Sequence, residues 1–115
     1  MGYYTYYSMS AQNIKSYEEY KSILEVVGHF EIFYKSDYDD NIHEAEFYTY
    51  DECKWYDHTA DMKNISRLFP NVVFKLHGEG EDRDDIWDAY YQNGFIEVCP
   101  AEIVYPKPKT IKWND

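Results

Sequence analysis

The order in which two kinds of hydrophobic periodicity follow one another most constrains the fold. In some segments apolar residues alternate with polar ones, as in a strand, and in others they recur every three to four positions, as in a helix. The alternating segments cover residues 3–9, 29–35, 43–50 and 72–77, and the helical segments cover residues 17–27 and 58–69. The order is therefore strand, helix, two strands, helix, strand, which predicts an α+β domain with a hydrophobic core between helices and sheet.

Local signals mark the ends of the predicted helices. Ser16 and Glu19 have the spacing of a capping box, and Gly28 is placed to end the first helix. Asp57 or Thr59 is placed to cap the second helix. The apolar faces of these elements predict the core residues Phe30, Ile32, Phe47, Leu68, Phe69, Phe74 and Leu76.

Asn93 and Gly94 separate two runs of aromatic and β-branched residues. Both residues tolerate the positive φ of a type I′ turn, so the pair predicts a β-hairpin. The alternative is a helix through residues 84–94 that ends at Gly94. With the hairpin, the chain has a ferredoxin-like βαββαβ order, with both helices on one face of an antiparallel sheet and a hairpin added at its C-terminal end. We expect one domain over residues 1–105 and an extended tail over residues 106–115.

The charge balance excludes several functions. Eleven basic residues stand against 22 acidic ones, for a net charge of −11. Proteins that bind nucleic acid or anionic membranes usually present a basic surface, so we expect neither partner. A protein partner with a basic surface fits this charge, although acidic residues also serve solubility alone. Aromatic residues make up 20% of the chain, which argues against disorder.

The sequence indicates a cytoplasmic protein. The first ten residues lack the basic and apolar regions of a signal peptide, and no apolar run is long enough to span a membrane. The two cysteines, Cys53 and Cys99, are too few for a disulfide framework, and we expect reduced thiols.

No motif predicts catalysis, a cofactor or a metal. The four histidines lack the spacing of zinc ligands. Asp37, Asp39 and Asn41 match the first three ligands of a calcium loop, but Ile42 stands where that loop needs glycine. The acidic residues of "GEGEDRDD", 78–85, resemble neither a phosphate-binding loop nor a buried carboxylate pair. We therefore expect a protein that is not an enzyme.

One stretch resembles a known family. The sequence "KWYDHTADMKNISRLFPNVVFKLHGEGEDRDDIWDAYYQNG" combines a capped helix ending in "LFP", a strand, glycine and glutamate residues, and a hairpin with a tryptophan. Over residues 54–99 the chain resembles small phage and plasmid proteins with a YubB-type ferredoxin-like domain. The resemblance implies an origin in a mobile element and the same fold. It carries over no catalytic residue.

These observations lead to one functional hypothesis and two alternatives. Carboxylates and aromatic rings interleave at 37–46 and 79–88, where they would imitate the phosphates and bases of a nucleic acid. The chain would then inhibit a bacterial defence nuclease, as an anti-CRISPR or anti-restriction protein in the host cell cytoplasm. The expected partner-binding residues are Asp37, Asp39, Asp40, Glu79, Glu81, Asp82, Asp84, Asp85, Trp87 and Tyr90. The alternatives are a homodimer or larger homo-oligomer serving as an accessory module, and a small-molecule-binding protein with a tyrosine-lined pocket.

Overall fold

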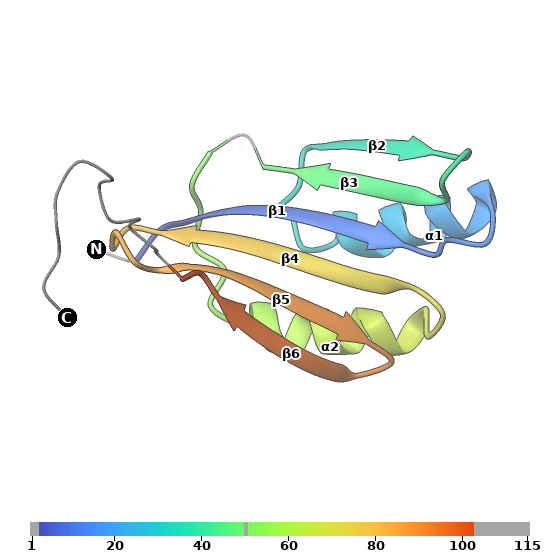
Figure 1. Cartoon of the computed structure of the whole chain (residues 1–115). Helices are drawn as coiled ribbons and strands as arrows, with labels where there is room; N and C mark the ends of the chain where they lie inside the picture. Colours follow the sequence, from blue (N-terminus) through green and yellow to red (C-terminus); the bar gives the residue numbers. More distant parts are fainter. Residues whose placement is uncertain (1–2, 50, 103–115) are drawn as a thin grey trace, which may run out of the picture.

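The structure is a computed structural model that describes residues 3–49 and 51–102 (Figure 1). Its elements are β1 (Thr5–Gln12), α1 (Tyr17–Gly28), β2 (Lys35–Asp39), β3 (Glu44–Tyr48), α2 (His58–Leu68), β4 (Val73–Gly80), β5 (Ile86–Gln92) and β6 (Phe95–Pro100). The strands form one six-stranded sheet in the order β2-β3-β1-β4-β5-β6, and every neighbouring pair is antiparallel. The fold is therefore α+β, as the order of periodicities predicts. The expected tail at 106–115 lies outside the described residues.

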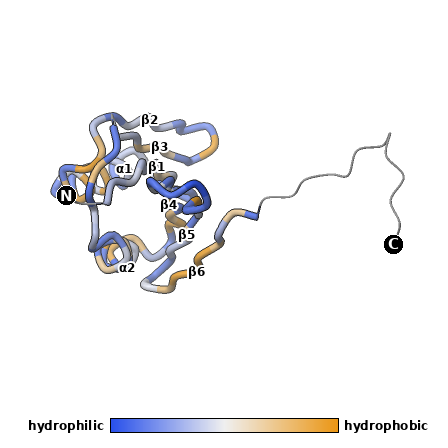
Figure 2. Tube along the Cα trace, turned by 90° about the vertical axis from the view of Figure 1, so that its left-hand side faces the viewer, coloured by the Kyte–Doolittle hydropathy of each residue, from blue (hydrophilic) through white to orange (hydrophobic). Residues whose placement is uncertain are grey.

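Both helices lie on the same side of the curved sheet (Figure 2). The helices contribute buried side chains from one face each, and β1, β3, β4 and β5 contribute every second residue. The largest fully buried side chains include Tyr91, Phe47, Phe74, Met9 and Ile23. The core is thus a single layer between the sheet and its two helices.

The predicted cap of α1 is present. The Ser16 hydroxyl accepts a hydrogen bond from the Glu19 amide at 3.1 Å. The Glu19 carboxylate reaches back to the Lys15 amide at 2.8 Å, one residue earlier than in a standard capping box. Gly28 is the last helical residue, but it has no left-handed conformation. His29 follows in the right-handed region, and Glu31, with φ of 56°, reverses the chain.

The prediction of a strand at 29–35 is wrong, because β2 lies about five residues later. The apolar residues of 30–33 pack inward as a connection instead of forming a ladder. Phe30 and Phe33 contact the Trp55 ring, with centroids 5.6 and 5.9 Å away. The segment predicted as an acidic loop forms the edge strand, whose Tyr38 stacks on Tyr20 at 4.7 Å. Because an edge strand needs only one covered face, β2 has a largely polar sequence, and that sequence was interpreted as a loop.

Leu68 is not in the core, contrary to the prediction. Its exposed fraction is 62%, whereas Met62, Ile65 and Ser66 are buried. At about 100° per residue, Met62, Ile65 and Ser66 share one stripe, and Leu68 lies roughly 110° from its centre. The Ser66 hydroxyl accepts a hydrogen bond from the Gly94 amide at 2.8 Å. A polar residue that contacts the β5–β6 turn is therefore buried on the face of α2 where the sequence predicted an apolar one.

The turn predicted at Asn93 and Gly94 is present. Both residues have positive φ, 48° and 83°, and Gln92 pairs with Phe95 across the turn. Residues 86–92 are therefore a strand, and the alternative of a helix over 84–94 is wrong. β6 is the edge of the sheet, and all six of its residues are exposed.

Candidate functional site

The predicted acidic site is divided between the two ends of the sheet. Asp39 pairs with Glu44, which pairs with Gln12 at the end of β1. The loop 81–85 follows Gly80, which pairs with Thr5 at the start of β1. Seven residue steps of β1 therefore separate the two clusters, roughly 23 Å, as the opposite positions of the two connections show (Figure 1). Asp37, Asp39 and Asp40 belong to the first cluster, and Glu79, Glu81, Asp82, Asp84 and Asp85 to the second.

The two aromatic residues of the predicted site lie on opposite faces of β5. Tyr90 pairs with Lys75 and Glu97 on the face away from the helices. Trp87 faces the helix side and is partly buried against the core. The acidic residues and both rings therefore do not form one continuous surface.

The loop 81–85 is held by hydrogen bonds to the start of the chain. The Tyr4 amide donates to the Glu81 carboxylate at 3.0 Å, and the Asp82 amide donates to the Tyr3 hydroxyl at 3.1 Å. Glu79, Glu81, Asp82 and Asp84 are exposed, and Asp85 is half-buried. Across the described residues, the carboxylates within ion-pair distance of a basic side chain are Asp88 and Glu79, at 2.7 and 3.1 Å from His77. The negative charge of this loop is thus available to an external partner.

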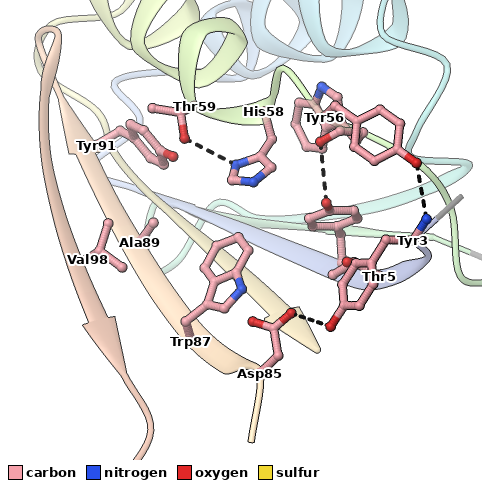
Figure 3. Close-up of a pocket in the computed structure, with 12 residues that line it drawn as sticks. Tyr3, Thr5, Tyr56, His58, Thr59, Asp85, Trp87, Ala89, Tyr91 and Val98 are labelled. Carbon is pink, nitrogen blue, oxygen red and sulfur yellow. Dashed lines mark hydrogen bonds between the residues drawn. The ribbon is translucent and has the colours of Figure 1, made fainter. Parts of the chain in front are cut away.

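A cavity of about 330 Å³ opens between the helix side of the sheet and the start of α2 (Figure 3). We call it the aromatic pocket, because six of the twelve residues that line it are tyrosine or tryptophan. Strands β1, β5 and β6 supply one wall, and α2 with the segment before it supplies the opposite wall. The lining residues are Tyr3, Thr5, Tyr7, Trp55, Tyr56, His58, Thr59, Asp85, Trp87, Ala89, Tyr91 and Val98.

Gly78 of β4 shapes the pocket by having no side chain. It pairs with Tyr7 on one side and with Trp87 on the other. A Cβ at this position would overlap the Trp87 ring. The indole therefore lies across β4, with its centroid 6.3 Å from that of Tyr7.

The rings of the pocket support one another. His58 stacks on Trp87 with centroids 5.1 Å apart and planes 23° apart. Tyr7 meets Trp55 edge to face at 5.4 Å, and the Trp55 indole N–H donates to Asp61 at 2.7 Å. Such contacts fix the ring orientations, so the cavity is largely pre-formed.

The Tyr91 hydroxyl is a buried polar group without a hydrogen-bond partner among the described residues. Tyr91 has an exposed fraction of 0% and lines the pocket. Burial raises the pKa of its phenol, and a weaker hydrogen-bonding interaction with the Thr59 side chain, which does not meet the geometry of a formed hydrogen bond, lowers it. The hydroxyl therefore stays protonated and retains its capacity to donate and accept a hydrogen bond.

Asp85 and Tyr3 lie together at the mouth of the pocket (Figure 3). The Tyr3 hydroxyl donates to the Asp85 carboxylate at 2.6 Å, and this bond is the largest cause of the raised pKa of Tyr3. Deeper in, burial lowers the pKa of His58, although Asp61 and Asp85 act in the opposite direction. At neutral pH the His58 ring is uncharged, and Asp85 gives the pocket its negative charge.

Three observations describe the reactive groups in and near the pocket. The Thr59 hydroxyl lies 3.4 Å from His58 Nδ1, longer than the roughly 2.6–3.2 Å of an activated nucleophile and its base. Burial raises the pKa of the Cys53 thiol, which keeps it protonated. In the part of the chain that the structure describes, no group of three potential ligands is arranged to hold a metal ion. Neither described helix is long and apolar enough to cross a membrane.

The sequence prediction missed most of this pocket. Of its lining residues, only Asp85 and Trp87 belong to the predicted site, although a tyrosine-lined pocket was one of the alternatives. The alternation of Tyr3, Thr5 and Tyr7 places them on one face of a strand. That signal does not reveal that β4 separates them from β5 with a glycine at the crossing point.

Comparisons with models of protein families, with curated proteins and with solved structures find no match.

Proposed function

We propose that this chain is a small-molecule-binding protein whose ligand occupies the aromatic pocket. The observation that carries the proposal is the cavity itself, about 330 Å³ in volume, with walls rich in tyrosine and tryptophan and the Asp85 carboxylate at its mouth. An apolar, aromatic cavity with a few convergent polar groups is the usual form of a small-molecule site.

The composition of the pocket also supports binding. Small-molecule sites combine apolar and aromatic walls with a few convergent polar groups, in cavities of roughly 300–1,000 Å³. The volume of about 330 Å³ lies at the lower end of this range, which favours a small ligand. The polar groups include the Asp85 carboxylate and the His58 ring.

The experiment that tests the proposal compares two tryptophan substitutions on α2. Thr59 lines the pocket and is exposed, whereas its neighbour Ala60 is exposed but does not line it. Small aromatic fragments such as phenol and indole should bind the natural chain in ligand-observed NMR. Thr59→Trp, which places a large ring in the cavity wall, should abolish that binding, and Ala60→Trp should retain it. Fragment binding that survives Thr59→Trp, or no fragment binding at all, would contradict the proposal.

A second candidate function is inhibition of a nucleic-acid-processing enzyme through the acidic loop 81–85. The specific observation in its favour is that Glu81, Asp82 and Asp84 are exposed and unpaired with basic side chains of the described residues, while the loop backbone is fixed to Tyr3 and Tyr4. Since the first acidic cluster, with Asp37, Asp39 and Asp40, lies at the other end of the sheet, one partner contacting both clusters would have to be long.

The test of this candidate is a salt titration of binding to a basic nuclease. Neutralising Glu81, Asp82 and Asp84 as amides should slow association and flatten its salt dependence. Unchanged rate and salt slope would leave the loop as a solubilising element.

The fold and origin complete the proposal. The order β2-β3-β1-β4, with both helices on one side, supports a ferredoxin-like unit to which β5 and β6 are added as a hairpin. The resemblance of residues 54–99 to phage and plasmid proteins supports an origin in a mobile element and action in the host cell cytoplasm.

A further inference from the structure

We infer that the aromatic pocket takes a small organic cation, specifically an alkylated ammonium group. This inference rests on the proposed function, since it names the ligand class of the same pocket. Its basis is the combination of aromatic rings with one carboxylate and no lysine or arginine among the described residues that line the cavity.

The aromatic rings provide the first part of the argument. The face of an aromatic ring carries negative potential, and Trp gives the strongest attraction for a cation, followed by Tyr. The Trp87 ring is covered by Gly78 and His58, so the rings that matter for a ligand are the tyrosines at the mouth. Tyr3 and Tyr56 line the pocket beside Asp85: the Tyr3 amide donates to the Tyr56 hydroxyl at 3.1 Å, and the Tyr3 hydroxyl donates to Asp85 at 2.6 Å. Quaternary ammonium groups are bound by such aromatic sets, because their methyl groups fill apolar space while the charge meets the rings.

The charged groups provide the second part. Asp85 is half-buried at the mouth, and its carboxylate accepts one hydrogen bond from Tyr3, which leaves further acceptor positions. His58 is the lining residue that would become positive if it were protonated. Burial lowers its pKa, so the ring is neutral at neutral pH. An anionic ligand would meet Asp85 without a cation to balance it, whereas an ammonium group would be balanced.

The start of α2 faces the pocket and has to be considered, because a helix N-terminus carries partial positive charge. Two carboxylates oppose it. Asp57 precedes the helix, and Asp61 stands in its first turn with its oxygen bonded to the Trp55 indole. The positive end of α2 is therefore offset by its own acidic residues.

The experiment uses a pair of ligands that differ in charge alone. Choline is compared with 3,3-dimethyl-1-butanol, in which carbon replaces the ammonium nitrogen at nearly the same shape. Trp55 and Trp87 line the pocket, so quenching of tryptophan fluorescence reports occupancy, with titration calorimetry as a second readout. We expect choline to bind at least tenfold more tightly than the neutral alcohol. A short peptide that carries one trimethyllysine, used in a third titration, distinguishes a methylated side chain from a small metabolite: tighter binding of the peptide than of choline indicates the side chain.

Two substitutions make the charge test local. Asp85→Asn and Asp84→Asn change the net charge equally, but Asp85 lines the pocket and Asp84 is exposed outside it. Asp85→Asn should weaken choline binding about tenfold and leave the neutral alcohol unchanged. Asp84→Asn should change neither. Thermal unfolding checks that each variant is folded, and the two-ligand comparison on the natural chain stands without them.

The outcomes separate this inference from the proposed function. Equal or tighter binding of the neutral alcohol overturns the cation inference and leaves the pocket as a site for uncharged ligands. No binding of choline at millimolar concentration also overturns it. The proposed function fails only if aromatic fragments fail as well, or if they bind in spite of Thr59→Trp.

Discussion

Replacing Tyr91 by phenylalanine should stabilise the protein, which is the reverse of the usual effect of removing a buried hydroxyl. The side chain has an exposed fraction of 0%, and its hydroxyl has no partner among the described residues. An unsatisfied buried polar group costs about 1–3 kcal/mol, and Tyr91→Phe removes that group while keeping the ring. Since 1 kcal/mol moves the Tm of a domain of up to 100 residues by about 4–8 °C, the Tm should rise by about 4 °C or more.

Tyr7→Phe is the matched control. Tyr7 is equally buried in the same pocket, but its hydroxyl donates to the Trp55 carbonyl at 3.4 Å. Its removal should lower the free energy of unfolding by about 0.5–1.5 kcal/mol, measured by urea denaturation of both variants and the natural chain. If Tyr91→Phe destabilises as much as Tyr7→Phe does, the Tyr91 hydroxyl is hydrogen-bonded in the folded protein, and the reasoning is refuted.

Three further predictions concern the helices, the glycines and pH. Leu68→Ala should cost under about 0.5 kcal/mol and Ile65→Ala about 2–5 kcal/mol in urea denaturation, because only Ile65 is buried; equal losses would contradict the assigned face of α2. Gly94→Ala should cost about 1 kcal/mol or more, because φ is 83°, whereas Gly28→Ala meets open space and should be neutral or stabilising; a tolerated Gly94→Ala would refute the positive-φ turn. Burial lowers the pKa of His58 below its ordinary value of 6.5. As the pH is lowered through 6.5, the unfolded chain therefore takes up a proton before the folded chain does, and the stability should decrease. His58→Gln should remove part of that fall in Tm between about pH 7 and 5, and an unchanged slope would contradict the lowered pKa.

The sequence predicted two kinds of element correctly: those marked by a few adjacent residues, and strands with one apolar, buried face and one polar, exposed face. The Ser16–Glu19 cap and the Asn93–Gly94 turn depend on a few adjacent residues, and both are present. Burial of Phe74 and Leu76 follows from alternation in a strand covered on one face.

The errors arise where tertiary contacts decide the outcome. The apolar residues 30–33 look like a strand, but Trp55 takes up their rings, and the polar strand β2 needs only one covered face. The pocket depends on β1 and β5 being brought together across Gly78, a neighbour relation that no single segment encodes. The sequence therefore identified the acidic residues, but it did not predict that they lie at opposite ends of the sheet.

The position of β6 has a consequence for how the pocket opens. β6 pairs only with β5, and its six exposed residues bury little apolar surface, so its amides should exchange with solvent sooner than those of β1 and β4, which are paired on both sides. Val98 of this strand is also part of the pocket wall. A local opening that separates β6 from β5 therefore uncovers the cavity and gives a ligand a way in without unfolding the core. A bound ligand that contacts Val98 would oppose this opening and slow the hydrogen exchange of the edge strand.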